Sequence, residues 1–500
     1  MLEGRDADLS QFSLGVDVFD RDASFDPAID AIVRVEAGRL RSKLTEYYTG
    51  RGLKDAVLID LPKGGYAPRL RVLRREPEST PQLRIRLAFR TWAALMLLCA
   101  LAGMVLLVVQ WRADDPARRL ARGPQPSIAV LPFDNMGARP EQAYFSDGIT
   151  EDIITDLSII PELTVIARHS TYAYKDRPVT IRNVARDLNV SHVLEGSVRK
   201  EGSMLRITAQ LIDAASGAHV WASRYDRSTG DVFAVQTDVA RKVAAALEIA
   251  LTRQAEAQLA RRGTLSIIAQ DASLQGRESF YQFTRAGVNR AVELFGASIE
   301  ADPNYADAYA WKSRALVYAF IAGFVTSKSE TIGNAIELAR KSTRLDSSLP
   351  MGHANLAWAL RWDGQYEAAA EAIGQAVALN PNFAEAYVWQ SLILSALGRG
   401  DEALAAIERS MALDPHYGVT SIFAYGRAQL ALGRPMAALG AFDRGIRRNP
   451  EFLPNHVFKV HVLELSDDKA AVTARQAMEE INSGYAASAA YRYYQEELLQ

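Results

Sequence analysis

The sequence predicts a multidomain protein of the α plus α/β class, with four structural parts and two linkers along its 500 residues. Three observations lead to this prediction: an apolar run without charges in the first quarter, a series of strand-like and helix-like segments after it, and a 34-residue period near the C-terminus. The predicted parts are a small helix-and-hairpin domain (1–75), a linker (76–90), one transmembrane helix (91–111), a second linker (112–125), a β-α-β-α-β-β-β-α domain (126–255) and an α-solenoid of helix pairs (270–500).

Composition excludes several classes of function. A formal charge of −2 and a pI near 6.4 argue against a chain that coats nucleic acid indiscriminately. The seven histidines and the one cysteine, Cys99, have no metal-site spacing, and a single cysteine allows no intrachain disulfide. The sequence also lacks a phosphate-binding G-x-x-x-x-G-K-[ST] loop and any spacing that indicates a nucleophile and its base. We therefore predict a protein that is not an enzyme and that binds no metal or cofactor.

The first domain is predicted to be a basic helix followed by a β-hairpin. Asp26 is the expected N-cap of the helix and Pro27 its first residue. Apolar residues then recur at three- and four-residue steps and give one stripe for packing, made of Val33, Ala37, Leu40, Leu44 and Tyr47. Two strand-like runs flank the basic turn Pro62-Lys63-Gly64-Gly65, a composition typical of hairpins.

This helix and hairpin resemble the winged-helix domain of OmpR-type regulators, where a recognition helix reading V-x-I-x-R-L-R-x-K-L precedes a wing ending in G-x-G-Y. The matching residues are Val35, Ala37, Arg39, Leu40, Arg41, Lys43 and Leu44, then Gly64, Gly65 and Tyr66. In that family the basic helix enters the major groove and the wing reaches neighbouring phosphates. The resemblance therefore implies DNA binding, with the candidate residues Arg34, Arg39, Arg41, Lys43 and Lys63.

Two features of the same domain favour a different interpretation. Residues 1–75 hold 13 Lys+Arg and 12 Asp+Glu, a net charge of only +1, whereas a phosphate-binding domain usually has a stronger excess. Few residues precede the basic helix, so the helix expected to pack behind it is predicted to be missing or truncated. The alternative is a cytoplasmic protein-contact domain whose arginines are solvated.

The apolar run from Trp92 to Trp111 is long enough to cross a bilayer as one helix. Within 20 residues of it, six arginines lie on the N-terminal side and four on the C-terminal side. The positive-inside rule then places the N-terminus in the cytoplasm and the C-terminal domains in the periplasm, with an inner-membrane anchor that contacts lipid through residues 91–111. Cys99 and Gly103 form a small-xxx-small pair that would permit a homodimer.

The segment 126–255 is predicted to alternate strands and helices. The expected elements are a buried strand at 128–133, a helix that begins at Ser146-Asp147-Gly148, a strand at 163–168, a helix at 181–188, three strands in an antiparallel meander, and a closing helix at 232–252. A helix start at Ser146 could hold an anion, and the alternative is an ordinary capped helix.

The same segment resembles the domain found beside tetratricopeptide repeats (TPRs) in many bacterial membrane proteins, some described as adenylate cyclases. The similarity lies in SIAVLPFDNM, YFSDGITEDIITDLS, VIARHSTYAYK, VARDLNVSHVLEGSVRK and RITAQLIDAASGAHVWASRYDR. It is also similar to the N-terminal domain of TolB, a periplasmic protein. The resemblance implies an architecture without an activity, because no segment remains for a cyclase catalytic domain.

The C-terminal half carries internal repeats. Successive units end at Asp302-Pro303, Asp346-Ser347, Asn380-Pro381, Asp414-Pro415 and Asn449-Pro450, whose second members lie 44, 34, 34 and 35 residues apart. This period identifies TPR helix pairs, with extra residues near 324–330 and an atypical pair after residue 450. Such arrays typically bind protein or peptide on a concave face, for which Tyr309, Trp311, Trp389 and Tyr425 are candidates. The alternatives are that these aromatic residues belong to the core, or that the array is a spacer without a ligand.

These parts together predict a membrane-anchored, non-enzymatic sensor or transcriptional regulator, similar in layout to ToxR/CadC-type one-component regulators. Its predicted partners are a protein or peptide, DNA, membrane lipid and a second copy of the chain. One alternative is a TPR assembly scaffold with a vestigial cytoplasmic domain. Another is an adenylate cyclase-related protein that lacks its catalytic domain.

Overall fold

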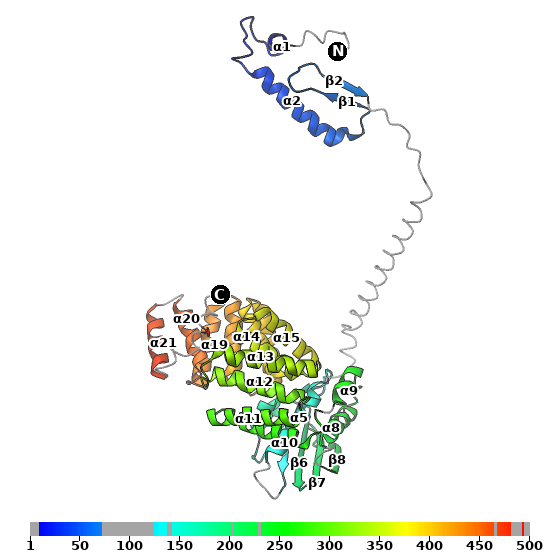
Figure 1. Ribbon diagram of the computed structural model, residues 1–500, viewed down its shortest axis with the longest axis vertical. Coiled ribbons are helices and arrows are strands. Elements are labelled where there is room, and N and C mark those ends of the chain that lie inside the picture. Colours follow the sequence, from blue (N-terminus) through cyan, green and yellow to red (C-terminus); the bar gives the residue numbers. More distant parts are fainter. Residues whose placement is uncertain are drawn as a thin grey trace, which may run out of the picture. The chain divides into compact units, whose positions relative to one another are not determined.

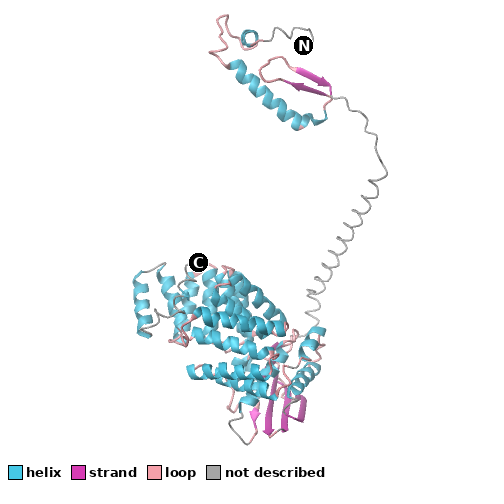
Figure 2. Ribbon diagram, viewed as in Figure 1, coloured by secondary structure: helices cyan, strands magenta, loops and turns pink. Residues whose placement is uncertain are grey.

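The computed structural model describes residues 10–72, 125–137, 143–202, 204–228, 232–261, 263–464, 468–481 and 493–494 (Figures 1 and 2). The chain divides into two compact units, Met1–Arg118 and Arg119–Gln500. The predicted transmembrane helix at 91–111 and the linker at 76–90 lie outside the described residues. None of the helices within the described ranges combines the length and apolar character needed to cross a membrane.

The first unit contains the predicted helix and hairpin. Its elements are α1 (Gln11–Asp17), α2 (Ile32–Thr49), the short 3-10 helix η2 (Arg51–Lys54), and the antiparallel strands β1 (Val57–Asp60) and β2 (Arg69–Val72). Helix α1 has seven residues and contacts α2. The hairpin prediction is confirmed.

Two details of the predicted basic helix are wrong. The helix begins at Ile32, because Asp26 closes a separate turn in which its Oδ1 accepts from the Ala28 N–H at 2.8 Å and its carbonyl accepts from Asp30. The predicted apolar stripe is also only partly covered. Val33 is buried and Ala37 and Leu44 are half-buried, whereas Leu40 and Tyr47 are 49% and 44% exposed.

The second unit begins with a six-stranded sheet in the order β5-β3-β6-β7-β8, with β4 paired to β6. The strands are β3 (Ser127–Val130), β4 (Asp134–Asn135), β5 (Thr164–Val165), β6 (His192–Glu201), β7 (Met204–Asp213) and β8 (His219–Ser228). Strands β5, β3, β4 and β6 are parallel, and β6, β7 and β8 form the predicted antiparallel meander. Strands β3 and β5 are shorter than the predicted strands at 128–133 and 163–168, and β4 was not predicted.

Helices cover the two faces of this sheet unequally. Helices α5 (Ala143–Ser158) and α8 (Val232–Ala246) bury the larger core against β6, β7 and β8. Helix α7 (Ile181–Leu188), whose bounds agree with the prediction, covers a smaller cluster around Val193 on the other face. The sequence did not indicate α6 (Arg168–Tyr172) or a separate α9 (Arg253–Leu259).

Two predicted helix ends in this domain are wrong. Helix α5 starts at Ala143, so Ser146, Asp147 and Gly148 lie inside it and do not form an N-terminal anion site. Helix α8 ends at Ala246 and does not reach residue 252, because Glu248 takes a left-handed conformation (φ 56°) and the Ile249 N–H returns to the Ala244 carbonyl. A left-handed residue at this position is a common way to end a helix.

Between residues 267 and 481 the described chain forms six antiparallel helix pairs, as the repeats predict (Figure 1). The pairs are α10 (Ile267–Phe280) with α11 (Arg285–Ala301), α12 (Ala306–Ile321) with α13 (Lys328–Leu345), α14 (Pro350–Asp363) with α15 (Tyr366–Leu379), α16 (Ala384–Ala396) with α17 (Gly400–Leu413), α18 (Val419–Ala431) with α19 (Pro435–Arg448), and α20 (Leu453–Glu464) with α21 (Asp468–Ile481). First helices of neighbouring pairs contact one another, which places them on the inner side of the curve. The extra residues near 324–330 lengthen the second pair, and the atypical final pair is present.

The α/β domain docks on the edge of the solenoid that is formed by the turns between repeats. These turns contain the residues whose spacing defines the period. The Asn382 side-chain amide donates to the carbonyls of Ser158 (3.1 Å) and Leu163 (2.9 Å), and the Ser170 hydroxyl donates to Asp414. Asp302 and Asp346 accept bonds from the segment that follows α9, at Thr264 and Arg261. A regular row of turns thus holds the sheet domain.

A buried charge cluster strengthens the same interface. The Arg277 guanidinium on α10 bonds Asp152 of α5 and Asp307 of α12, each at 2.7 Å, while its side chain is only 8% exposed. One cation therefore links the α/β domain to two helix pairs. An ion pair in such a dry position requires every partner, because removal of one leaves an uncompensated charge.

Candidate functional sites

The candidate DNA-contacting residues occupy different environments in the first unit. Arg39, Lys43 and Lys63 are exposed, and Arg39 pairs with Glu36 at 2.6 Å, one turn away on α2. Arg34 donates to the Pro27 carbonyl at 3.1 Å, which ties α2 to the preceding turn. Arg39 and Lys43 lie four residues apart, so they share one face of the helix. Arg39 and Lys43 on the helix and Lys63 on the hairpin are thus candidates with exposed side chains.

Arg41 has a different position from its neighbours. Its guanidinium donates to the backbone carbonyls of Leu61 (3.0 Å), Pro62 (3.0 Å) and Gly65 (2.9 Å). These three bonds attach the hairpin turn to α2. We therefore assign Arg41 to the positioning of the hairpin, a role that the family motif does not reveal because it depends on tertiary contacts.

The partly covered stripe of α2 bears on the alternative interpretation of this domain. The stripe members Leu40 and Tyr47 are 49% and 44% exposed, and on the hairpin Leu70 and Val72 are 52% and 73% exposed. An apolar surface of this kind, on a unit with few basic residues in excess, suits contact with another protein. The first unit therefore combines a small basic face with an apolar one.

The four aromatic candidates in the solenoid divide into two groups. Trp311 and Trp389 are 1% and 5% exposed and belong to the core. Trp389 stacks on Trp358 with ring centres 5.1 Å apart, and the Arg314 guanidinium lies 5.5 Å from the Trp389 ring. Both tryptophans are therefore core residues, which is the alternative interpretation given for them from the sequence.

The two tyrosine candidates are half-buried. The Tyr309 hydroxyl donates to the Pro303 carbonyl at 3.2 Å, and Arg444 lies over the Tyr425 ring at 5.9 Å. Both tyrosines therefore contact other residues of the repeats and stabilise them. Their exposed portions remain accessible to a partner.

Two functional candidates that sequence reasoning missed are Tyr493 and Tyr494. Both are buried, at 4% and 6% exposure, against the first helices of the solenoid. Tyr493 packs on Trp362, with ring centres 4.3 Å apart, and Tyr494 lies beside Phe423 and Phe458. The available signal was the aromatic run Y-R-Y-Y in a polar C-terminal segment, which has no counterpart in the 34-residue pattern.

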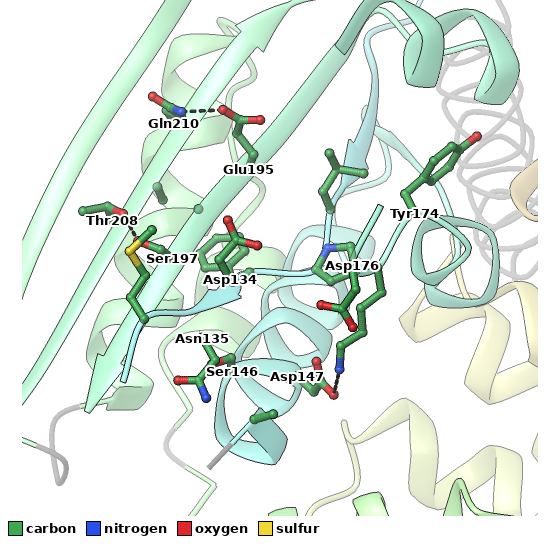
Figure 3. A pocket seen from close by; sticks show the side chains of 18 of the residues that line it. Asp134, Asn135, Ser146, Asp147, Tyr174, Asp176, Glu195, Ser197, Thr208 and Gln210 are labelled. Atoms are coloured by element: carbon green, nitrogen blue, oxygen red, sulfur yellow. Dashed lines mark hydrogen bonds and ion pairs between the residues drawn. The ribbon is translucent and has the colours of Figure 1, made fainter. Parts of the chain in front are cut away.

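The α/β domain contains a pocket of about 970 Å³, shown in Figure 3. Its walls are the loop after β3, the start of α5, the loop at 174–179 and the face of β6, β7 and β8 that α5 and α8 leave uncovered. Lys175 pairs with Asp147 at 2.6 Å, and Gln210 donates to Glu195 across the neighbouring strands. The hydroxyls of Ser197 and Thr208 bond each other at 2.6 Å.

Charged side chains of both signs line this pocket, among them Asp147, Glu195, Lys175 and Arg224. Burial raises the pKa of Tyr174, whose hydroxyl donates to Asp187. No group of three or more acidic, histidine or cysteine side chains that could hold a metal occurs within the described ranges.

Comparisons with known proteins match two parts of the chain. Residues 124–242 match the family model for the second domain of HilA/YgeH-like transcriptional regulators, and residues 384–417 match a tetratricopeptide repeat. Over 256 residues the chain is 43% identical to "Putative adenylate cyclase 3" of Rhizobium meliloti (strain 1021). That alignment covers 50% of this chain and 44% of the relative, so the chain spans less than half of the relative's length.

Solved structures resemble part of the chain at low sequence identity. A thermophilic TPR protein of Thermus thermophilus is 20% identical and matches 39% of this chain and 99% of its own, with a TM-score of 0.32. The PilF protein of Pseudomonas aeruginosa is 16% identical and matches 46% of this chain and 99% of its own, with a TM-score of 0.33.

The matches agree with the two domain types of the second unit. A domain similar to one in transcriptional regulators is followed by repeats of a kind that mediates protein interactions. A role as a regulator or as a scaffold follows from this pair.

Proposed function

We propose that the protein is a membrane-anchored, non-enzymatic transcriptional regulator of the ToxR/CadC-like layout. The solenoid and the TolB-like α/β domain bind a protein or peptide outside the cytoplasm, and the winged-helix-like unit relays this signal to DNA inside it. The observation that carries the proposal is the match of residues 124–242 to a transcriptional-regulator domain, in a chain that also presents Arg39, Lys43 and Lys63 on a helix and hairpin.

DNA binding is tested with the full chain and about 30-base-pair duplexes of random sequence, because phosphate contacts carry non-specific affinity. We expect binding that weakens steeply between about 50 and 200 mM salt. The variant Arg39→Ala/Lys43→Ala should bind duplexes of every sequence more weakly. The slope of the logarithm of the binding constant against the logarithm of salt concentration should fall by about two, one for each lost phosphate contact. The control Arg290→Ala/Arg340→Ala removes two exposed solenoid cations, each paired to a glutamate, and should bind as the unaltered chain does.

The outcome separates the regulator from its alternatives. Absence of binding at low salt would contradict the relay to DNA and would favour a TPR scaffold, for which the partly covered stripe of α2 is a further argument. A cyclase-related role is the third alternative. The 43% identity to a cyclase-named relative favours it, and the 44% coverage of that relative weakens it.

The anchor and its orientation form the second test of the proposal. Reporter fusions after residues 75 and 260 should place the two junctions in opposite compartments, the first in the cytoplasm and the second in the periplasm. A cytoplasmic readout from both fusions would overturn the membrane-crossing part of the proposal and leave the DNA-binding part to stand by its own assay.

A further inference from the structure

The solenoid carries a binding site that this chain fills with its own residues. We call it the tyrosine site, formed by the residues that contact the Tyr493–Tyr494 pair: Lys328, Arg361, Trp362, Tyr366, Phe423 and Phe458. These residues come from α13, α14, α15, α18 and α20, so the site spans most of the repeat array. The predicted candidates Trp311, Trp389, Tyr309 and Tyr425 are not part of it.

The contacts of Tyr493 combine shape, charge and hydrogen bonds. Its ring lies on Trp362 at 4.3 Å, with the Arg361 guanidinium at 5.3 Å and the Lys328 ammonium at 5.2 Å. Its hydroxyl donates to the Arg361 carbonyl at 2.9 Å and lies 3.0 Å from the Tyr366 hydroxyl. A phenylalanine would keep the ring contacts and lose both hydroxyl contacts, so the first position selects tyrosine.

Tyr494 makes contacts that are apolar and less selective. Its ring meets Phe423, Phe458 and Trp362 edge-on, with ring centres 6.1, 5.8 and 5.7 Å away. Edge-to-face packing of this kind accepts any aromatic ring of similar size. The second position therefore requires an aromatic residue without a need for its hydroxyl.

Trp362 supplies an independent sign that the site is suited to a further ligand. Its indole is fully buried, yet Nε1 has no hydrogen-bond acceptor among the residues that the structure describes. A buried donor without a partner is costly, and a segment that brings an acceptor to this point relieves the cost. The Tyr493–Tyr494 pair fills the site without doing so.

We propose that the tyrosine site recognises an extended protein segment with two adjacent aromatic residues, the first a tyrosine, and that Tyr493–Tyr494 hold the site until such a partner displaces them. This inference deepens the proposed peptide-binding function of the solenoid and rests on it. A tethered segment competes at an effective concentration on the order of millimolar. The apparent affinity for a partner is therefore reduced by the fraction of molecules in which the site is already filled.

The test uses a fluorescein-labelled peptide with the sequence of residues 488–498, SAAYRYYQEEL, and three full-length chains. They are the unaltered chain, Tyr493→Ala/Tyr494→Ala, and the control Tyr387→Ala, which alters a half-buried tyrosine elsewhere in the solenoid whose hydroxyl donates to the Pro381 carbonyl. Fluorescence anisotropy should give at least about tenfold tighter binding to the double variant than to the other two, since only the double variant has an empty site. Far-ultraviolet circular dichroism checks that each chain is folded.

Two further arms connect binding to the proposed contacts. Adding Lys328→Ala to the double variant should weaken the peptide by about threefold, the usual effect of one partly exposed cation–ring contact. A peptide with both of the corresponding tyrosines changed to alanine should not bind. Equal affinity of the labelled peptide for all three chains, binding of the alanine peptide, or no binding to the folded double variant would each overturn the proposal. None of these results affects DNA binding, by which the regulator function is judged separately.

Discussion

At the scale of single residues, Arg277 is the clearest case of a side chain whose environment decides its importance. It lies between Asp152 and Asp307 and links three helices from two domains. Removing the Arg277 charge from water costs free energy, and the attraction of both carboxylates offsets this cost. The exposed pair of Arg290 and Glu293 has the same chemistry without this constraint.

We expect Arg277→Met to lower the free energy of unfolding by about 3–5 kcal/mol, because two buried carboxylates lose their counter-ion. Urea unfolding followed by circular dichroism measures this change. Arg290→Ala should alter it by no more than about 0.5 kcal/mol. The triple variant Asp152→Asn/Arg277→Met/Asp307→Leu should recover most of the loss, and failure to do so would show that Arg277 acts by packing alone.

At the scale of elements, small residues decide how closely paired helices approach. A Cβ added at Gly426 on α18 would lie 2.4 Å from Cε1 of Phe442 on α19, which is itself fully buried. At Gly374 on α15 an added Cβ would meet nothing within 4 Å. The two glycines therefore differ in whether a side chain can be accommodated, although both lie inside helices of the same solenoid.

The two alanine substitutions should have opposite effects on stability. Gly426→Ala overpacks the α18–α19 contact and should destabilise by about 1–3 kcal/mol. Gly374→Ala removes conformational freedom from the unfolded chain and should stabilise by about 0.5–1 kcal/mol. Thermal unfolding of both variants measures the difference, and a stabilising Gly426→Ala would contradict the close approach of these helices.

At the scale of the whole second unit, the turns between repeats act as the docking edge for the α/β domain. Asn382, which is 4% exposed, contributes several of the polar contacts, because its amide nitrogen donates to the Ser158 and Leu163 carbonyls and its amide oxygen accepts from the Val165 N–H at 3.4 Å. The corresponding residue of a later turn, Glu451, is exposed. This position of the repeat therefore contacts the α/β domain at some turns, as at His416, whose Nε2 lies 3.0 Å from Asp187 Oδ2, and faces solvent at others.

We expect Asn382→Ala to loosen this edge at a cost of about 2 kcal/mol or more, because buried carbonyls at Ser158 and Leu163 lose their donor. Hydrogen exchange read by mass spectrometry should speed up in residues 158–165 while the meander β6–β8 keeps its protection. Glu451→Ala is the matched control and should change neither. Unaltered exchange in residues 158–165 would mean that the two domains are held together by other contacts.

Sequence periodicity was sufficient to predict the elements that pack by a local rule. The 34-residue spacing located the helix pairs, and alternation with turn residues located the meander and α7. Helix ends were less predictable. Asp26 has the composition of an N-cap and closes a separate turn, and Ser146 lies inside α5, because the surrounding backbone satisfies those groups in other ways.

What the sequence alone determined is the helix pairs of the solenoid and the main strands and helices of the α/β domain, since a helical or strand period depends on neighbours a few residues away. Tertiary structure alone decided which of those residues meet across long separations: Arg41 with the hairpin, Asn382 with the sheet domain, and Tyr493 with Trp362. Those contacts join residues from 20 to more than 200 positions apart, as between Arg41 and Leu61 or Asn382 and Leu163. Such contacts depend on how distant parts of the chain fold back on one another, which a pattern among neighbouring residues does not show.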